Sequence, residues 1–551
     1  MKETRQHIYV NLVFDEISIH KHVHFNGSSY VGHVDMGGGS NDMSDEYATD
    51  ALVPLIVASN LHFKVPLGYF LINKITGATK ANLVEVCIQK LNEIGVKVIS
   101  VTCDGLAANL VMFEHLGCSV RPDGLIETLI KTDTQPEPVY AILDVVHMIK
   151  LIRNTWATLG IIKNMQGDII NWNYIRELNN LQNCEGLHLA NKITNEHINW
   201  HDQNMKSRLA LQVFSESTAQ SIDYAREVLK LKEFESSQST TEFLRVMNNA
   251  CDVLNSKSKF GHGFKGPLTK ATKESWNTLL TNTTQYLSTI CDASGIPLIS
   301  LSTRKKTGFL GMIMSMMSFS KIFESYVENN HLEYVLTYKF SQDHIETFFS
   351  CVRGSMGFNS NPTAQQFQSC FKKIVLGSCN KSFSVNSITC LDETICLNVF
   401  TSNKECQNFV QEKFQLDEIN DELSVFESNE GLSQYQEKVV EYIAGFVTKK
   451  VNNPCRDCSA LKESYSLICF KTRGGLTVPD EKCVKICKLC ERIFREQKPN
   501  LHRNNILQYL SVKVMTSLHS QFRELFSGKY IRILTYTNLK MLNSLHFFNI
   551  L

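Results

Sequence analysis

Proline is scarce in this chain, at 11 of 551 residues, which excludes Pro-rich linkers and collagen-like repeats. Long apolar runs are missing too. The closest, Gly308 to Phe319, is short, Met-rich and broken by serine, so it predicts a buried helix rather than a membrane span. The first six residues are charged and polar, without the apolar core of a signal peptide. We therefore expect a soluble protein with no membrane partner.

Net charge is nearly absent, because 56 Lys and Arg face 55 Asp and Glu. The balance hides an asymmetry: from Lys449 onward, 18 Lys and Arg stand against 7 Asp and Glu, which leaves 38 against 48 in the first 448 residues. A basic C-terminal quarter is typical of a surface that meets a phosphate backbone, although solvated surface charge is the commoner explanation of such a bias.

The composition is that of an ordinary globular protein, with 43% hydrophobic and 20% charged residues. The length predicts three or four domains, or one large interrupted domain. The 18 cysteines are scattered, which favours thiols in a reducing compartment over a disulfide framework.

Strand and helix patterns alternate over residues 1–156, which predicts a mixed sheet with helices on its faces. The expected strands are Ile8–Phe14, Tyr30–Asp35, Ala51–Ala58, Val65–Ile72, Val96–Val101 and Tyr140–Leu143, and the expected helices are Ala81–Ile94, Ala107–Leu116 and His147–Trp156. Helical periodicity dominates residues 157–335, as in Ser207–Val228 and Thr241–Asn255, and indicates an insertion. A helix-bearing segment at 336–375, a Ser/Asn/Glu-rich linker at 376–432 and a basic, Cys-rich helical domain at 433–551 complete the predicted order.

Three carboxylates stand out. Asp15 ends the first strand, Asp104 ends a buried strand, and Glu346 lies in an amphipathic helix. Any one alone is more simply a cap or a turn residue. Together, two strand-end acids and one helix acid can converge on one sheet edge and hold Mg²⁺ or Mn²⁺, whose preferred ligands are oxygens. Two such ions can clamp the oxygens of a phosphodiester displacement.

Several blocks resemble the P-element and THAP-domain DNA transposases. They are FDE (14–16), CDGLAAN (103–109), LDVVHMIKLIRN (143–154), LNSKSKFGHGFKGPL (254–268), RKKTGFLG (304–311), QDHIETFFSCVRGSMGFNSNPT (342–363), EYIAGFVTKKV (441–451) and LICFKTRGGLTVPD (467–480). The 342–363 block is the most specific, and the ordered set covers nearly the whole chain.

The resemblance implies an α/β protein: a ribonuclease-H-like mixed sheet core, interrupted by a large helical insertion and followed by a mainly helical C-terminal domain. It implies a cut-and-paste transposase whose catalytic and metal-binding triad is Asp15, Asp104 and Glu346. The expected partners are element ends and target DNA, bound by a homo-oligomer in the nucleus.

The resemblance also implies GTP as a cofactor of the insertion, with Asp252, Asn255 and Asp343 as contacts. A carboxylate can accept hydrogen bonds from guanine N1 and N2, which gives a reason for an acid there. The stretch NKIT, residues 191–194, departs from the GTPase NKxD pattern, and no Walker-type glycine loop compensates.

The family usually begins with a zinc-coordinating THAP domain, and this chain opens about eight residues before its first strand. We therefore expect that module to be missing. Two other interpretations remain open: a domesticated or truncated transposase-derived DNA-binding or interaction protein without transposition activity, and a GTP-binding regulator.

The remaining motifs are weaker. Cys455, Cys458, Cys487 and Cys490, with Cys469 and Cys483 nearby, have zinc-like spacing, but buried thiols are the favoured interpretation over Zn²⁺. His20, His22 and His24 would share one strand face, more simply as exposed side chains than as metal ligands. Asp144 and His147 are expected to support the triad, and Asp144 is also a less favoured candidate for holding the metal. Glu16 should point away from Asp15 if the strand continues. Lys150, Arg153 and Lys321 could contact DNA phosphates, although solvated side chains are the commoner case.

Overall fold

The computed structural model describes residues 7–25, 27, 30–37, 45–119, 126–301, 304–357, 359–376, 395–396, 431–450, 467–471, 476–479, 481–500 and 506–521. The chain forms two compact units. One draws its residues from 1–170, 204–211 and 246–404, and the other from 171–203, 212–245 and 405–551. No helix in the described ranges is both long and apolar enough to cross a bilayer.

The first unit is built on an eight-stranded mixed sheet. Its strand order is β13-β5-β4-β1-β7-β9-β8, with β6 also paired to β4. The strands are β1 (Ile8–Ser18), β4 (Asp50–Ala58), β5 (Phe63–Pro66), β6 (Phe70–Ile72), β7 (Val96–Cys103), β8 (Leu129–Ile130), β9 (Val139–Leu143) and β13 (Ile395–Cys396). The central strand β1 runs antiparallel to β4 and parallel to β7, and β7 runs parallel to β9.

Two predicted strands are shorter than expected. The run Val65–Ile72 is divided between β5 and β6, because they pair with different parts of β4: Pro66 lies opposite Leu55, and Phe70 opposite Leu52. Of the predicted strand at residues 30–35, only Tyr30–Val31 forms a strand, β3, which pairs with β2 (His24–Phe25) in a separate ribbon.

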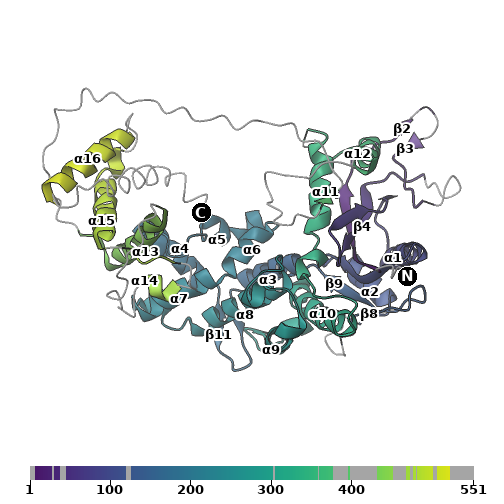
Figure 1. Ribbon diagram of the computed structural model, residues 1–551, viewed down its shortest axis with the longest axis horizontal. Helices are drawn as coiled ribbons and strands as arrows, with labels where there is room; N and C mark the ends of the chain where they lie inside the picture. Colours follow the sequence, from purple (N-terminus) through teal and green to yellow (C-terminus); the bar gives the residue numbers. More distant parts are fainter. Residues whose placement is uncertain are drawn as a thin grey trace, which may run out of the picture. The chain divides into compact units, whose positions relative to one another are not determined.

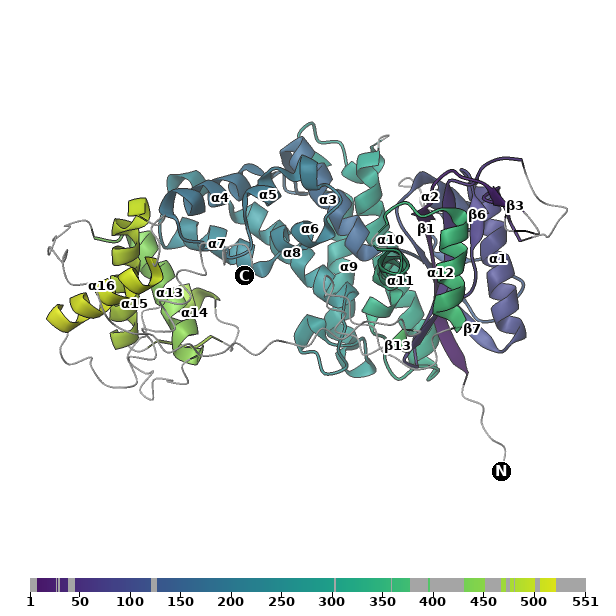
Figure 2. The ribbon, with the colours of Figure 1, turned by 90° about the horizontal axis from the view of Figure 1, so that it is seen from above.

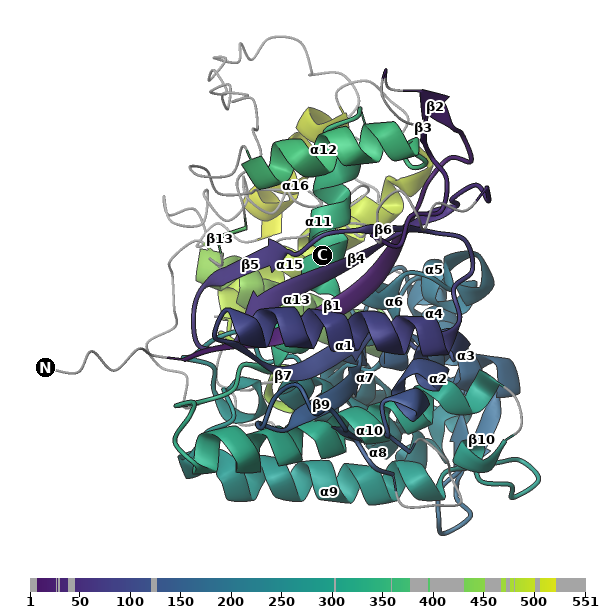
Figure 3. The same ribbon diagram turned by 90° about the vertical axis from the view of Figure 1, so that its right-hand side faces the viewer.

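Helices cover both faces of the sheet, which explains the near-continuous apolar runs of β1 and β4. In Figure 1 the strands lie between α11 (Asp343–Gly354) and α1 (Gly77–Glu93), and Figure 3 views the sheet from the α1 side. On the α11 face, Val13 and Ile17 share a buried cluster with Phe348 of α11 and Phe367 of α12 (Ala364–Leu376). This cluster fixes which face of β1 the helix α11 meets.

The helix α10 (Thr307–Ile322) packs against β9 and against α3 (Val145–Leu159). Ser315 Oγ donates to the Leu143 carbonyl at 2.7 Å and accepts from Leu143 N at 3.1 Å, and Ser318 Oγ donates to the Ala141 carbonyl at 2.5 Å. These hydroxyls satisfy backbone groups of β9 that would otherwise be buried without partners. The Met-rich run of α10 is thus a buried helix, as its sequence predicts.

The segment after α3 is mainly helical, with a small sheet of order β11-β10-β12. Its elements are β10 (Ile161–Lys163), β11 (Ile169–Asn171), α4 (Asn173–Glu185), α5 (Asn195–Ile198), α6 (Ser207–Val213), α7 (Glu216–Glu227), α8 (Gln238–Leu254), α9 (Lys273–Thr289) and β12 (Cys291–Asp292). The single helix predicted over Ser207–Val228 is divided between α6 and α7. Ser215 causes the division, because it caps α7 by accepting from Thr218 N.

In the second unit the C-terminal helices α13 (Gln434–Lys450), α14 (Leu467–Lys471), α15 (Glu481–Glu496) and α16 (Ile506–Gln521) gather together (Figure 2). Two of them form hydrogen bonds with the end of α4 and the turn after it. Tyr435 Oη of α13 donates to the Leu187 carbonyl at 2.7 Å, and Arg495 of α15 donates to the Glu185 carbonyl at 2.6 Å. Most of the predicted linker 376–432 lies outside the described residues.

Candidate active site

Three neighbouring parallel strands carry acids at matching positions. Asp104 and Asp144 directly follow β7 and β9, whereas Asp15, predicted to end its strand, lies within β1, which continues to Ser18 because it goes on pairing with β4. Val13 of β1 pairs with Thr102 of β7, so Asp15 and Asp104 each come two residues further along. Cys103 pairs with Leu143 of β9, so Asp104 and Asp144 each come one residue further. Because the carboxyl ends of parallel strands meet at one edge of a sheet, the register places these three acids side by side.

The helix α11 is fixed to this edge through its first residues. Gln342 donates from its backbone N to Asp144 Oδ1 at 3.0 Å and from its side chain to the Phe14 carbonyl at 3.2 Å. Asp144 Oδ2 accepts from His147 N at 2.8 Å and thereby caps α3. Both oxygens of Asp144 therefore hold helix ends, and Glu346 follows one turn into α11.

The carboxyl of Asp15 is partly buried and feels the charges of the other two predicted triad residues. Burial raises the pKa of Asp15 to about 7, and the negative charges of Asp104 and Glu346 add to this, against a 2.9 Å hydrogen bond from Glu16 N. Burial and the charge of Asp343 likewise raise the pKa of Glu346. Asp15 therefore lies within electrostatic range of the other two predicted residues.

Asp104 is held by the chain that follows it. Its Oδ1 accepts from Asn109 Nδ2 at 2.6 Å and from Leu106 N at 3.1 Å. The intervening Gly105 is closely packed: a Cβ there would lie 2.9 Å from Met148 Cε of α3 and 3.0 Å from Thr307 Cγ2 of α10, so these side chains would have to shift. The Asp-Gly pair of the CDGLAAN block thus has a steric reason.

Two basic side chains of α3 face the acids. Burial lowers the pKa of Lys150, while the charges of Glu346, Asp104 and Asp144 oppose that shift, so this lysine lies among the acids. Burial and the charge of Lys150 lower the pKa of His147 to about 4, so the imidazole is neutral at pH 7. Lys150 is buried rather than solvated, and it offsets part of the local negative charge.

The chemistry of the acids fits a divalent cation. Three carboxylates gathered at one edge, with the pKa of Asp15 and Glu346 raised, form a site whose repulsion a cation would relieve. The three side chains do not yet have the geometry of a metal site, because no three His, Cys, Asp or Glu residues in the described ranges are close enough to hold one ion.

The predicted nucleotide contacts lie near the start of α11. Thr337 Oγ1 accepts from Ser256 N at 2.9 Å, joining the end of α8 to the turn that leads into Asp343. Lys257 Nζ lies 4.0 Å from Asp343 Oδ2. Lys265 Nζ lies 3.9 Å from Asp252 Oδ1. Asn255 Oδ1 is buried and has no hydrogen-bond partner among the described residues. Thr194, in the stretch NKIT, instead caps α5.

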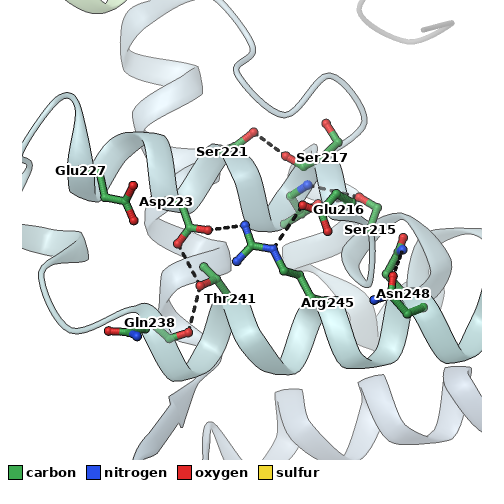
Figure 4. Close-up of polar contacts among 12 residues, drawn as sticks. Ser215, Glu216, Ser217, Ser221, Asp223, Glu227, Gln238, Thr241, Arg245 and Asn248 are labelled. Carbon is green, nitrogen blue, oxygen red and sulfur yellow. Dashed lines mark hydrogen bonds and ion pairs between the residues drawn. The ribbon is translucent and has the colours of Figure 1, made fainter. Parts of the chain in front are cut away.

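A second polar cluster joins α7 and α8 (Figure 4). The buried Asp223 pairs with Arg226 and Arg245, each at 2.5 Å, and accepts from Thr241 at 2.9 Å. A cavity of about 450 Å³ beside it is also lined by Glu242 and by Phe470 of α14. Both guanidinium groups already face a carboxylate, so the cavity is not built to take a triphosphate.

The other predicted groups have mixed outcomes. Cys483, Cys487 and Cys490 are buried on α15, and Cys469 is exposed, whereas Cys455 and Cys458 lie outside the described residues. The ring centroids of His20 and His22 lie 6.3 Å apart, and no metal-binding group that includes them occurs in the described part of the chain. Lys321 is paired with Glu127 at 2.6 Å.

Sequence reasoning missed Lys80 and Asn109. Lys80 lies on the buried face of α1 with Val84 and Ile88, four and eight residues later. A lysine in an apolar stripe is a signal that could have been found, because such a position needs a buried partner. Asn109 stands five residues after Asp104, in the first turn of α2 (Ala107–His115), where its side chain can reach back to the strand end.

Four protein-family models match the chain in order. They are "TNP-like, RNase H N-terminal domain" at residues 1–117, "TNP-like, GTP-binding insertion domain" at 146–267, "TNP-like, RNase H C-terminal domain" at 338–372 and "DNA transposase THAP9, C-terminal domain" at 431–535. The fold is thus a ribonuclease-H-like mixed sheet that carries a GTP-binding insertion domain and a helical C-terminal domain, as predicted.

Two curated relatives are similar over most of the chain. The human DNA transposase THAP9 is 28% identical over 530 residues, covering 88% of this chain and 56% of the relative. The transposable element P transposase of Drosophila melanogaster is 27% identical over 470 residues, covering 83% and 59%. The chain therefore spans less than two thirds of the length of either relative.

A solved structure supports the fold. The Drosophila P element transposase strand transfer complex matches with a TM-score of 0.56 and 23% identity, covering 68% of this chain and 78% of that one. Fold, domain order and relatives together define a transposase-type ribonuclease-H-like protein. The chain belongs to the P-element/THAP9 transposase family.

Proposed function

We propose that this chain is a cut-and-paste DNA transposase that cleaves DNA and transfers strands through Asp15, Asp104 and Glu346. One observation carries the proposal: the parallel register of β1 and β7 sets Asp15 and Asp104 at matching positions, and Glu346 comes from a helix whose start is bonded to the same sheet. Membership of a transposase family supports the reaction class.

The three carboxylates would hold divalent cations, Mg²⁺ or Mn²⁺. Such cations, when bound, promote attack by water or a 3′-hydroxyl on a phosphodiester and stabilise the leaving oxygen. The chain's own residues supply the rest. Asp15 and Asp104 come from the rigid sheet edge, and Glu346 comes from α11, which Gln342 ties to Asp144 and Phe14. The charge of Lys150, which is buried and within electrostatic range of Glu346 and Asp104, would offset part of the negative charge of the site.

DNA is the proposed partner, as element ends and as target, bound by a homo-oligomer. The family match and the likeness to a strand transfer complex support this proposal. Because the substrate would be chromosomal DNA, the proposed location is the nucleus.

The decisive experiment compares Asp104→Asn with wild type in strand transfer of precut DNA ends with Mn²⁺. We expect a loss on the order of a thousandfold or more, because a missing ligand forfeits several kcal/mol of charge stabilisation. Thermal stability should be kept or raised, since one negative charge leaves a repulsive cluster.

Asp133→Asn is the matched control, because it removes the same charge from an exposed position of the same domain. Equal activity of both variants would contradict the proposed triad. A wild-type chain that binds DNA but joins no ends with either cation would favour the alternative, a transposase-derived binding protein without transposition activity.

We also propose that GTP binds at the end of α8, with Asp252, Asn255 and Asp343 as contacts. The GTP-binding insertion model and the buried, unpartnered Asn255 Oδ1 support this. The alternative, a regulator that binds GTP without cutting DNA, would keep the same contacts.

Asp252→Asn and Asp343→Asn test which acid reads the base. The variant at the reading position should bind a fluorescent GTP analogue roughly tenfold to a hundredfold more weakly, because a charge-assisted pairing with guanine is lost. It should bind the xanthine analogue better, since an Asn amide can donate to the xanthine oxygen. Unchanged GTP affinity in both variants, measured against Asp133→Asn, would overturn this assignment.

A further inference from the structure

A lysine is buried behind the proposed triad, on the other face of the sheet. Lys80 is 6% exposed and lies on the apolar stripe of α1. A buried ammonium is strongly unfavourable unless it is paired and hydrogen-bonded. Here it lies 2.6 Å from Glu16 Oε1 and donates to Asn109 Oδ1 at 2.9 Å. Glu16 points to this face because side chains alternate along β1, with Asp15 on the α11 side.

The lysine settles the orientation of the Asn109 amide. An ammonium can only donate, so the oxygen of Asn109 must face Lys80 and its NH₂ group must face away. That NH₂ group donates to Asp104 Oδ1 at 2.6 Å. Asn109 is itself 7% exposed, so this hydrogen bond is shielded from competing water. A flipped amide would leave Lys80 facing a donor and Asp104 facing an acceptor.

The four residues form a continuous relay: Glu16, Lys80, Asn109, Asp104. It begins next to Asp15 on β1, crosses α1 and α2, and ends on the acid that follows β7. Its members are held at 2.6, 2.9 and 2.6 Å. The relay therefore connects β1 to the end of β7 and fixes one oxygen of Asp104.

We propose that Lys80 and Asn109 are positioning residues: Lys80 sets the Asn109 amide, which orients the Asp104 carboxylate for a divalent cation. The proposal rests on the proposed function, in which Asp104 is a cation ligand. Groups that hydrogen-bond to a ligating carboxylate typically change metal affinity or activity by about tenfold to a hundredfold when removed.

The test measures Mn²⁺ binding to the full chain without DNA, from the paramagnetic resonance signal of free Mn²⁺. Asn109→Leu keeps the approximate volume and removes the donor, so we expect Mn²⁺ affinity to fall roughly tenfold to a hundredfold. The Mn²⁺ concentration needed for half-maximal strand transfer should rise by the same factor, with little change in the rate at saturating Mn²⁺.

Lys80 needs a charge-balanced variant, because Lys80→Met alone leaves Glu16 unpaired and threatens the fold. The double variant Lys80→Met with Glu16→Gln removes the ion pair as a unit, and we expect its Mn²⁺ affinity to fall as well. Lys90→Met is the control on the same helix, since Lys90 is exposed and pairs with Glu93, three residues later, at 2.9 Å. Circular dichroism and thermal unfolding check that each variant is folded.

The outcomes separate this proposal from the one beneath it. If Asp104→Asn loses Mn²⁺ binding while folded Asn109→Leu binds like wild type, the triad stands and the relay is overturned. If the double variant binds like wild type while Asn109→Leu does not, the role of Lys80 is overturned. If wild type and Asp104→Asn bind Mn²⁺ equally, both proposals fall.

Discussion

Gly308 lies where α10 comes closest to α3. A Cβ at this position would sit 2.9 Å from Ile152 N, a backbone atom that cannot rotate away, and 2.9 Å from Leu151 Cβ. We therefore expect Gly308→Ala to lower the free energy of unfolding by roughly 1–3 kcal/mol, as overpacking does. Urea denaturation of the full chain measures it.

Gly354 is the matched control. It also lies in a helix, α11, but a Cβ there meets nothing within 4 Å. Gly354→Ala should leave stability unchanged or raise it by up to about 1 kcal/mol, because alanine favours helix. If both substitutions stabilise the chain alike, close packing does not explain the glycine in α10.

Single residues also show how far the sequence led toward the site. Asp15 and Asp104 could be singled out because each follows an apolar run, although only Asp104 ends its strand and Asp15 lies within β1. Their proximity needed the parallel register of β1 and β7, which no local pattern encodes. Asn109 and Lys80 were missed because their roles depend on how α1 and α2 are rotated against the sheet. The sequence predicts that Lys150 is solvated or contacts DNA, but its side chain is buried and is influenced by the charges of Glu346 and Asp104.

At the scale of elements, the short helix α14 of the second unit ends in a buried lysine, Lys471. Lys471 donates to the Leu189 carbonyl and lies 5.6 Å from the ring centre of Tyr442. Burial lowers its pKa from 10.5 to about 7. Between these values the unfolded chain binds more protons at this site than the folded chain, so stability rises with pH.

Comparison with Lys471→Met isolates this effect. From pH 7 to pH 10, the wild type should gain on the order of a few kcal/mol relative to the variant, because other titrating groups cancel in the difference. Chemical denaturation of both proteins at several pH values measures it. A difference that stays constant across the interval would show that the lysine keeps an ordinary pKa in the folded chain.

Elements were predicted well where one local signal dominates. The strand at residues 8–14 and the helix ending near residue 94 follow from long periodic runs, and they correspond to β1 and α1. The division between α6 and α7 was missed because Ser215, an N-cap, falls within a helical period. The division between β5 and β6 depends on their partners on β4, which a single strand pattern does not reveal.

At the scale of the whole molecule, the two units share the chain in alternation. The second unit takes residues 171–203 and 212–245 from the middle of the chain and joins them with residues from 405 onward. Sequence patterns give the order of helices and strands but not which distant segments pack together. For that reason the docking of α13–α15 on the turn after α4 was not predicted from the sequence.

The wide spacing of the three acids has a consequence for synthesis. A ribosome releases Asp15 and Asp104 early, and Glu346 emerges only after the entire intervening insertion. A nascent or prematurely terminated polypeptide that stops before α11 therefore contains Asp15 and Asp104 and lacks Glu346. If all three acids are needed to cut DNA, such an unfinished copy would lack a complete set of cation ligands.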